Sequence, residues 1–283
     1  MSHGSAAVEP RESKGNEAAR QLNAIVIINA DDWGRDAVTT DRTLDCHFHE
    51  AISSVSAMVF TEDSERAASL ARQHGVDAGL HLNFTLPFTA PQCSPMLLEH
   101  QQKIFRFLNS HQYAGFIYHP GLTASFEYVV RAQFEEFQRL FGAPATRVDG
   151  HHHMHLSRNI SSQKLLPAGM IVRRNFTFVS GEVGFLTRSY RSWEDRRLAR
   201  RYRVSDYFFD LSEILPGDRR RNLEKILELA RSFNVEVECH PRNNEEYRFL
   251  LEGGIARFAD KVEIARGFIL RPAHLVDKTG NLL

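Results

Sequence analysis

The sequence predicts an α/β fold, a distorted (β/α) barrel of about seven parallel strands in a single domain, from three observations. Continuous apolar, β-branched runs such as Ala24–Ala30 are typical of strands that are buried on both faces. Amphipathic stretches alternate with these runs, as helices alternate with strands in β-α-β units. Carboxylate and imidazole side chains follow several of the runs, and parallel strands bring such groups to one rim of a sheet.

In chain order, the first part of the sequence alternates strand and helix patterns. The predicted strands are Ile25–Ala30, Ser54–Phe60 and Asp77–Phe84, and the predicted helices are Ala37–Ala51 and Glu62–His74. Gly75 is a natural end for the second helix, because glycine readily adopts the left-handed conformation found there. The Pro-rich loop Thr85–Pro95 follows the third strand, where loops often form the walls of binding sites.

The second part of the sequence continues the alternation. Phe126–Phe141 has a helical period, with one apolar side formed by Val129, Val130, Phe134, Phe137 and Leu140. Arg147–Asp149 leads into a histidine cluster, and further strands are expected near Ala168–Val172, Tyr207–Phe209 and Val235–Cys239. No internal repeat or domain boundary interrupts the pattern.

Length and composition limit the number of domains and the kinds of partner that the chain can have. The 283 residues suit one large domain, and the first 20 are polar and charged without an apolar signal-peptide segment. We therefore expect a disordered leader over 1–20 and the barrel domain over 21–283. The 35 basic and 35 acidic residues balance, which argues against nucleic acid as the main partner. Three cysteines without a CxxC pattern and no apolar run of ~18–20 residues indicate a cytoplasmic protein without a membrane span.

Asp31 and Asp32 follow the first strand directly and precede Trp33-Gly34. Adjacent carboxylates at a strand end, just before a turn, are typical of a site that carries chemistry in α/β proteins. The alternative is a structural role, in which the pair caps the following helix and places an acid in its first turn.

Three further strand ends carry histidine: His81 in AGLHLNF, His151 in RVDGHHHMHL and His240 in VEVECHP. Two imidazoles and a carboxylate make a catalytic divalent-metal centre, and Asp32, His81 and His151 are the best candidates for its ligands. Taken alone, His81 is more typical of a structural histidine. The histidine run could also be a surface tract that scavenges metal.

The residues around these histidines suggest finer roles. If the run is extended, His151, His153 and His155 share one face, and Asp149 can orient an imidazole. His240 fits a general acid, because imidazole titrates near neutrality. Its alternative is a strand-terminal histidine followed by a proline turn.

Arg173 and Arg174 follow another predicted strand. One of them could stabilise a developing oxyanion or hold a carboxylate, and a solvated structural arginine is the alternative. The basic stretch 188–203 and the triplet 219–221 predict a solvated helix surface or one that faces a second copy in a homodimer; binding to a polyanion is the alternative.

Four segments together resemble the YdjC-type carbohydrate deacetylases, typified by chitooligosaccharide deacetylases. They are INADDWG, GLHLNFT, VDGHHHMH and ECHP, which occur in the family's order between residues 24 and 242. The sequence departs from the family pattern at Trp33, where phenylalanine is usual, at Arg242, where glycine is common, and in the loop Thr85–Pro95.

The resemblance implies a distorted barrel with one divalent metal, held by Asp32, His81 and His151. It also implies that Asp31 is the general base and His240 the general acid in hydrolysis of an N-acetyl group from an amino sugar or oligosaccharide. Zinc or magnesium is the first expectation for the metal, and cobalt, nickel or iron would suit the same ligands. Three other functions stay open: hydrolysis of a different amide or ester, a catalytically silent sugar-binding or scaffold protein, and a non-haem iron oxygenase.

Overall fold

The computed structural model describes residues 25–177, 193–215, 219–259 and 262–271. Its strands are β1 (Ile25–Trp33), β2 (Ser54–Ala57), β3 (Ala78–Leu82), β4 (Arg147–Gly150), β5 (Ile171–Val172), β6 (Tyr207–Asp210), β7 (Asn234–Cys239) and β8 (Glu263–Ile264). Its α-helices are α2 (Ala37–Phe48), α3 (Ser64–His74), α4 (Pro95–Leu108), α5 (Thr123–Phe141), α6 (Arg158–Gln163), α8 (Leu211–Ile214), α9 (Arg219–Ala230) and α10 (Asn244–Leu251). Residues 193–199 are also helical, and the 3₁₀ turns are η1 (Ala114–Phe116), η2 (Pro120–Leu122), η3 (His151–Leu156) and η4 (Gly254–Phe258).

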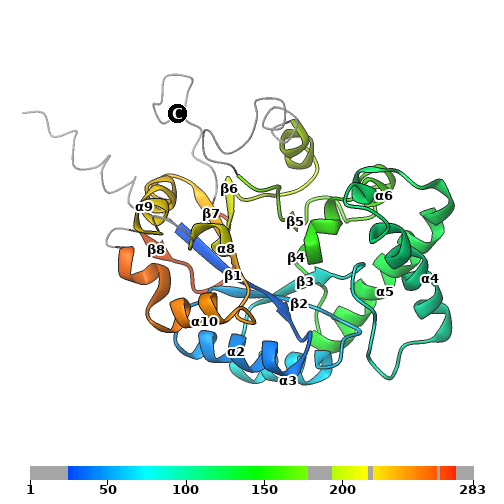
Figure 1. Ribbon diagram of the computed structural model, residues 1–283, viewed down its shortest axis with the longest axis horizontal. Coiled ribbons are helices and arrows are strands. Elements are labelled where there is room, and N and C mark those ends of the chain that lie inside the picture. Colours follow the sequence, from blue (N-terminus) through cyan, green and yellow to red (C-terminus); the bar gives the residue numbers. More distant parts are fainter. Residues whose placement is uncertain (1–24, 178–192, 216–218, 260–261, 272–283) are drawn as a thin grey trace, which may run out of the picture.

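The strands form one parallel sheet in the order β5-β4-β3-β2-β1-β7-β6, and the short β8 pairs with the start of β1. The sheet curls, so that its two edge strands approach each other (Figure 1). Ile171 on β5 bridges to Arg203 just before β6, and the Thr177 N–H after β5 donates to the Phe208 carbonyl on β6. The predicted distorted barrel of about seven parallel strands is therefore confirmed.

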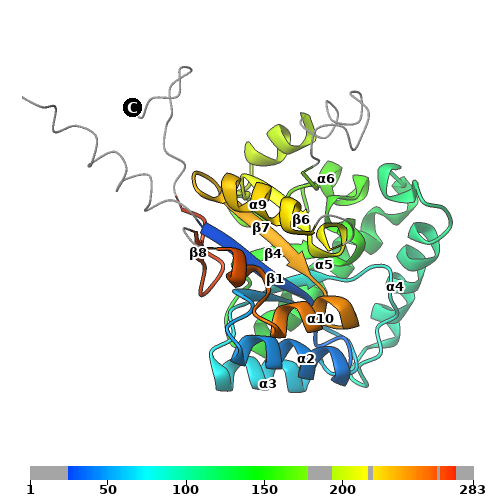
Figure 2. The ribbon, with the colours of Figure 1, turned by 60° about the vertical axis from the view of Figure 1, so that its left-hand side comes forward.

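Helices cover the outside of the curled sheet. In both ribbon views α2, α3 and α10 lie together along one side, and α4 and α5 flank another (Figures 1 and 2). The start of β1 shows why its sequence is apolar at four consecutive positions: Val26 and Ile28 belong to the main core, whereas Ile25 and Ile27 pack on the opposite face with Ala265. No helix among the described residues is both long and apolar enough to cross a bilayer.

Some helices and strands end where the sequence predicts, and others are shorter than predicted. The α3 helix ends at His74 as expected, and Gly75 follows with a left-handed φ of 68°. The predicted helix Ala37–Ala51 ends at Phe48, and the predicted strand Ser54–Phe60 ends at Ala57. The proposed leader over residues 1–20 lies outside the described residues.

One local prediction was wrong, and one alternative is excluded. The first strand does not stop at Ala30 but continues to Trp33, with a register shift between these residues and a φ of 67° at Asp32. The carboxylate pair also does not cap α2, because Asp36 does so by accepting the Thr39 N–H at 2.9 Å.

The histidine run is also not extended. His152 and His153 have φ values of 52° and 57° inside η3. Two consecutive residues in the left-handed conformation interrupt an extended chain, so the alternation of side chains along a strand does not apply here. The imidazoles of this run therefore point to different neighbours.

Candidate active site

The carboxyl ends of β1, β3 and β4 bring the three expected metal ligands together. Asp32 Oδ1 lies 3.3 Å from His81 Nε2 and 2.9 Å from His151 Nδ1. Register explains part of this convergence, because His81 pairs with Asp149 and Leu82 with Gly150, so η3 starts beside the end of β3. All three side chains are buried.

These residues have the donor arrangement that a divalent cation requires. Asp32 Oδ1 and His81 Nε2 are buried and have no hydrogen-bond partner among the described residues. His81 Nδ1 lies 2.8 Å from Asp149 Oδ1. Because a carboxylate only accepts, Nδ1 carries a proton, so Nε2 is the ring nitrogen that faces Asp32 and could bind a cation. The site therefore fits a cation bound by one carboxylate and two imidazoles.

Asp149 is fixed on both of its oxygens. Oδ1 faces His81, while Oδ2 accepts the Ser56 hydroxyl at 2.6 Å and lies 2.7 Å from Arg173 Nη2. Burial alone would raise the pKa of this carboxyl, but the positive charge of Arg173 and the neighbouring His81 lower it strongly. Asp149 therefore stays ionised and orients the His81 ring, which agrees with the role expected for it from its position in the sequence.

Arg173 is the centre of a buried charge cluster. Its guanidinium nitrogens lie 2.6 to 2.9 Å from oxygens of four carboxylates, those of Asp31, Asp149, Glu236 and Glu238. The residue is 2% exposed. Its Nε and both terminal nitrogens are occupied, so the side chain holds carboxylates and has no N–H directed at an outside ligand.

Asp31 is held in one orientation by this cluster. Arg173 Nη1 and Nη2 donate to Asp31 Oδ2 and Oδ1 at 2.6 and 2.8 Å, and the Asn29 amide donates to Oδ1 at 2.8 Å. Burial opposes ionisation, but Arg173 and His81 lower the pKa of the Asp31 carboxyl below its ordinary value. Asp31 is therefore a fixed, ionised carboxylate, and its Oδ2 lies 3.9 Å from His81 Nε2.

His240 lies at the adjacent strand end. Ala30 on β1 pairs with Cys239, the last residue of β7, so Asp31 on β1 lies next to His240, the first residue after β7. The His240 backbone N–H donates to Glu246 Oε2 at 2.7 Å. Burial would lower the pKa of His240, but the carboxylates of Asp31, Glu238 and Glu246 raise it. A half-buried imidazole with a raised pKa has the properties of a proton donor near neutrality.

The remaining histidines of the run occupy separate positions. His152 stacks on His151 with ring centroids 4.0 Å apart, and its Nδ1 lies 3.1 Å from Thr85 Oγ1. His153 Nε2 lies 3.5 Å from Glu238 Oε1, and His155 Nε2 donates to the Arg173 carbonyl at 3.0 Å. These contacts surround the cluster and do not add to the three candidate ligands.

Two acids of the site were given no role from the sequence. Glu236 and Glu238 both contact Arg173, and both are buried on β7. The signal was present in NVEVEC, where acidic residues alternate with Val235, Val237 and Cys239 in a strand that is buried throughout. Acids repeated at every second position of a buried strand indicate a polar interior of the barrel.

Arg174 lies outside the cluster. Its Nη2 contacts Asp195 at 2.7 Å, and its Nη1 donates to the Ser205 carbonyl.

Arg242, one of the departures from the family pattern, pairs with Asp36 at 2.7 Å. It therefore ties the segment after His240 to the start of α2.

The fold and the site define an α/β barrel protein with a buried carboxylate–imidazole cluster at the carboxyl edge of its sheet. The family model described as YdjC-like protein matches residues 25–262, so the chain belongs to this family, as its sequence motifs predict.

Curated relatives carry related names. The chain is 33% identical over 141 residues to a chitooligosaccharide deacetylase of Serratia marcescens, a match that covers 49% of this chain and 53% of the relative. It is 30% identical over 138 residues to a chitooligosaccharide deacetylase of Yersinia pestis (strain Pestoides F), with 48% and 52% covered. The chain thus spans about half the length of the curated relatives it matches.

A solved structure supports the fold. A protein of Enterococcus faecalis V583, whose suggested role is cellobiose-phosphate cleavage, matches 88% of this chain and 97% of its own with a TM-score of 0.57. The sequence identity is 17%, so this similarity concerns the architecture alone.

Proposed function

We propose that this chain is a metal-dependent hydrolase that removes an N-acetyl group from an amino sugar or oligosaccharide. The observation that carries the proposal is the buried triad of Asp32, His81 and His151 directly beside the fixed carboxylate of Asp31. Membership of the YdjC-like family and the names of the curated relatives support the same reaction.

The triad would hold one divalent ion, with zinc or magnesium as the first candidates. Such an ion supplies Lewis acidity, which activates water and polarises an acyl carbonyl. Asp32 contributes the negative ligand, and Asp149 fixes the His81 ring through Nδ1.

Asp31 is the proposed general base. Its carboxylate is ionised, and Arg173 and Asn29 leave a lone pair on Oδ2 that can accept a proton from the attacking water. Of the two roles expected for Arg173, we propose the holding of a carboxylate, because its nitrogens already contact acidic oxygens. Arg173 would thus act through Asp31 and not on the oxyanion.

His240 is the proposed general acid. An amine is a poor leaving group unless it is protonated, and His240 lies beside Asp31 at the neighbouring strand end. The carboxylates around it stabilise the imidazolium form that donates the proton. The two proton carriers therefore stand on adjacent strands with opposite charge preferences.

The test is release of acetate from a panel of N-acetylated sugars, with and without a chelator. Asp31→Asn should keep the bound metal and lose about 10²- to 10⁴-fold in kcat, because it removes the proposed base and leaves the three candidate metal ligands in place. Asp32→Asn should lose the metal itself. Asp41→Asn, on an exposed side chain, is the matched control and should leave turnover unchanged.

Near-full turnover in Asp31→Asn would remove this residue from the base role. Bound metal without acetate from any sugar would instead favour another acyl substrate or a silent homologue.

A further inference from the structure

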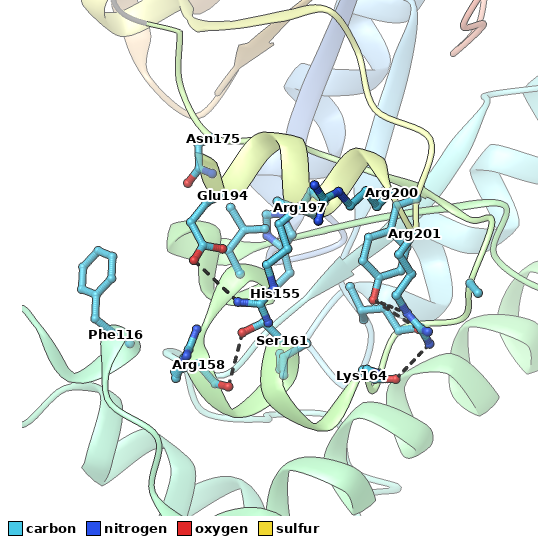
Figure 3. A pocket seen from close by; sticks show the side chains of 17 residues that line it. Phe116, His155, Arg158, Ser161, Lys164, Asn175, Glu194, Arg197, Arg200 and Arg201 are labelled. Carbon is cyan, nitrogen blue, oxygen red and sulfur yellow. Dashed lines mark hydrogen bonds and ion pairs between the residues drawn. The ribbon is translucent and has the colours of Figure 1, made fainter. Parts of the chain in front are cut away.

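A cavity of about 540 Å³ lies apart from the candidate active site. Figure 3 shows it between α6 with the following residue Lys164 on one side and the helical segment 193–199 on the other. Its lining includes none of the candidate catalytic or metal-binding residues (Asp31, Asp32, His81, His151, Arg173 and His240). Two segments connect the sites: η3, which starts at His151 and supplies His155 to the cavity wall, and the segment from Arg173 to Asn175, whose last residue also lines the cavity.

The cavity is strongly basic in a chain whose formal net charge is zero. Its cationic lining residues are Arg158, Lys164, Arg197, Arg200 and Arg201. Glu194 is the one carboxylate among the lining residues. Cations gathered around one cavity repel each other, and that repulsion is relieved when an anion enters.

Internal partners do not neutralise this charge. Glu194 Oε1 lies 3.7 Å from Arg197 Nη1, a loose ion pair. Among the described residues, Arg201 donates to neutral oxygens alone, those of the Lys164 and Leu166 carbonyls and the Tyr202 hydroxyl. Within the described ranges no carboxylate lies within 4.0 Å of the charged groups of Arg158, Lys164 or Arg200.

Uncharged lining residues leave room for more than the anionic group itself. Phe116, Ser161 and Tyr202 offer aromatic faces and hydroxyls. His155 adds no charge at neutral pH, because burial lowers its pKa to about 3. A volume of this size suits a small organic molecule.

The two sites differ in the charge that they favour. In the candidate active site the carboxyl groups of Asp31, Asp149, Glu236 and Glu238 surround the single guanidinium of Arg173, so its N–H groups are already occupied and do not face an outside anion. We propose that the cavity between α6 and residues 193–201 is a binding site for a small-molecule oxyanion, a phosphate ester or a carboxylate. Guanidinium groups bind such oxyanions through paired N–H donors, and four of the five cations here are arginines. This proposal does not depend on the deacetylase reaction.

The test is a titration of the full chain with inorganic phosphate, gluconate and glucose at constant ionic strength, read by calorimetry and by tryptophan fluorescence. The Trp193 ring centroid lies 5.9 Å from Arg197 Cζ, so this residue reports on the cavity wall. Phosphate or gluconate should bind saturably, and neutral glucose should not. Binding of phosphate alone would identify a phosphate-ester site, and binding of both would identify a general oxyanion site.

Variants assign the binding to this cavity. Arg158→Gln combined with Arg197→Gln should weaken oxyanion binding by about tenfold or more, since each charge-assisted contact is strong. If that double variant does not fold, the exposed Arg158→Gln alone should give a smaller loss in the same direction. Arg131→Gln, an exposed arginine of α5 paired with Glu135 at 3.8 Å, removes the same charge elsewhere and should leave binding unchanged.

Three results would overturn the proposal. They are the absence of saturable oxyanion binding, an equal loss of affinity in Arg131→Gln, and a loss confined to Asp32→Asn, which would assign the anion to the metal site.

Discussion

Arg173 fixes the positions of other residues in the candidate active site. Its guanidinium contacts Asp31 and Asp149, and Asp149 in turn fixes the ring of His81. One buried side chain thus positions the proposed base and, through a carboxylate, one of the proposed metal ligands. Removing one partner from such a cluster leaves uncompensated charge in the interior, which destabilises a protein by about 3–5 kcal/mol. The arginine therefore serves both the stability of the barrel interior and the geometry of the site.

Asp149→Asn tests the support of the metal site. The amide is a weaker acceptor for the His81 Nδ1–H, so the ring loses part of its orientation and basicity. We expect metal affinity to fall about 10- to 100-fold, measured by competition with a chromophoric chelator. Ser56→Ala is the control, because it removes only the hydroxyl bound to Asp149 Oδ2 and should have a smaller effect. Unchanged affinity in Asp149→Asn would show that this contact does not support the site.

Individual site residues were predictable where a strand pattern fixed their position. Asp32, His81 and His151 each follow or end a recognisable strand, and parallel strands place such ends at one rim. Glu236 and Glu238 were not assigned, because the alternation in a strand does not say which face points toward the interior of a barrel.

At the scale of elements, periodicity predicted strands and helices better than it predicted their ends. The early end of β2 and the extension of β1 to Trp33 depend on pairing between these two strands, in which Trp33 is opposite Ala57 after a register shift. The geometry of η3 depends on two left-handed histidines, a conformation that tertiary contacts impose against local preference. Such features have no local pattern in the sequence.

The α10 helix has a pH-dependent attachment to β7. Glu246 on α10 is 1% exposed and accepts the His240 N–H, and burial raises the pKa of its carboxyl to about 7 from an ordinary value of 4.5. Between about pH 4.5 and 7 the folded state binds this proton more tightly than the unfolded chain does. Its contribution to the free energy of unfolding therefore falls as pH rises through that window, by roughly 3 kcal/mol in all.

Glu246→Gln should remove this dependence, because glutamine resembles the protonated acid. The free energy of unfolding of the variant, relative to the unmodified chain, should rise from pH 5 to pH 8 in urea titrations. Glu245→Gln, at an exposed position of the same helix, is the control. Parallel pH profiles for Glu246→Gln and the unmodified chain would contradict the raised pKa.

On the scale of the whole molecule, the candidate metal site joins segments that are distant in the sequence. Its candidate ligands come from β1, β3 and the start of η3, which follows β4, and these strands lie in the part of the sheet with the order β4-β3-β2-β1. The unfolded chain cannot hold the three groups together, so a cation that binds them binds the folded state. Metal binding should consequently stabilise the barrel as a unit.

We therefore expect removal of the metal to lower the Tm of the global unfolding transition. At a free metal concentration about 100 times the Kd, binding adds roughly 2.7 kcal/mol to the free energy of unfolding. The Tm, measured by calorimetry, should rise by several degrees with zinc or magnesium and return to its starting value with a chelator. Asp32→Asn should abolish the rise, because it removes the only carboxylate of the triad. The same rise in Asp32→Asn would place the stabilising cation elsewhere in the molecule, and no rise in the unmodified chain would argue against metal binding at the triad.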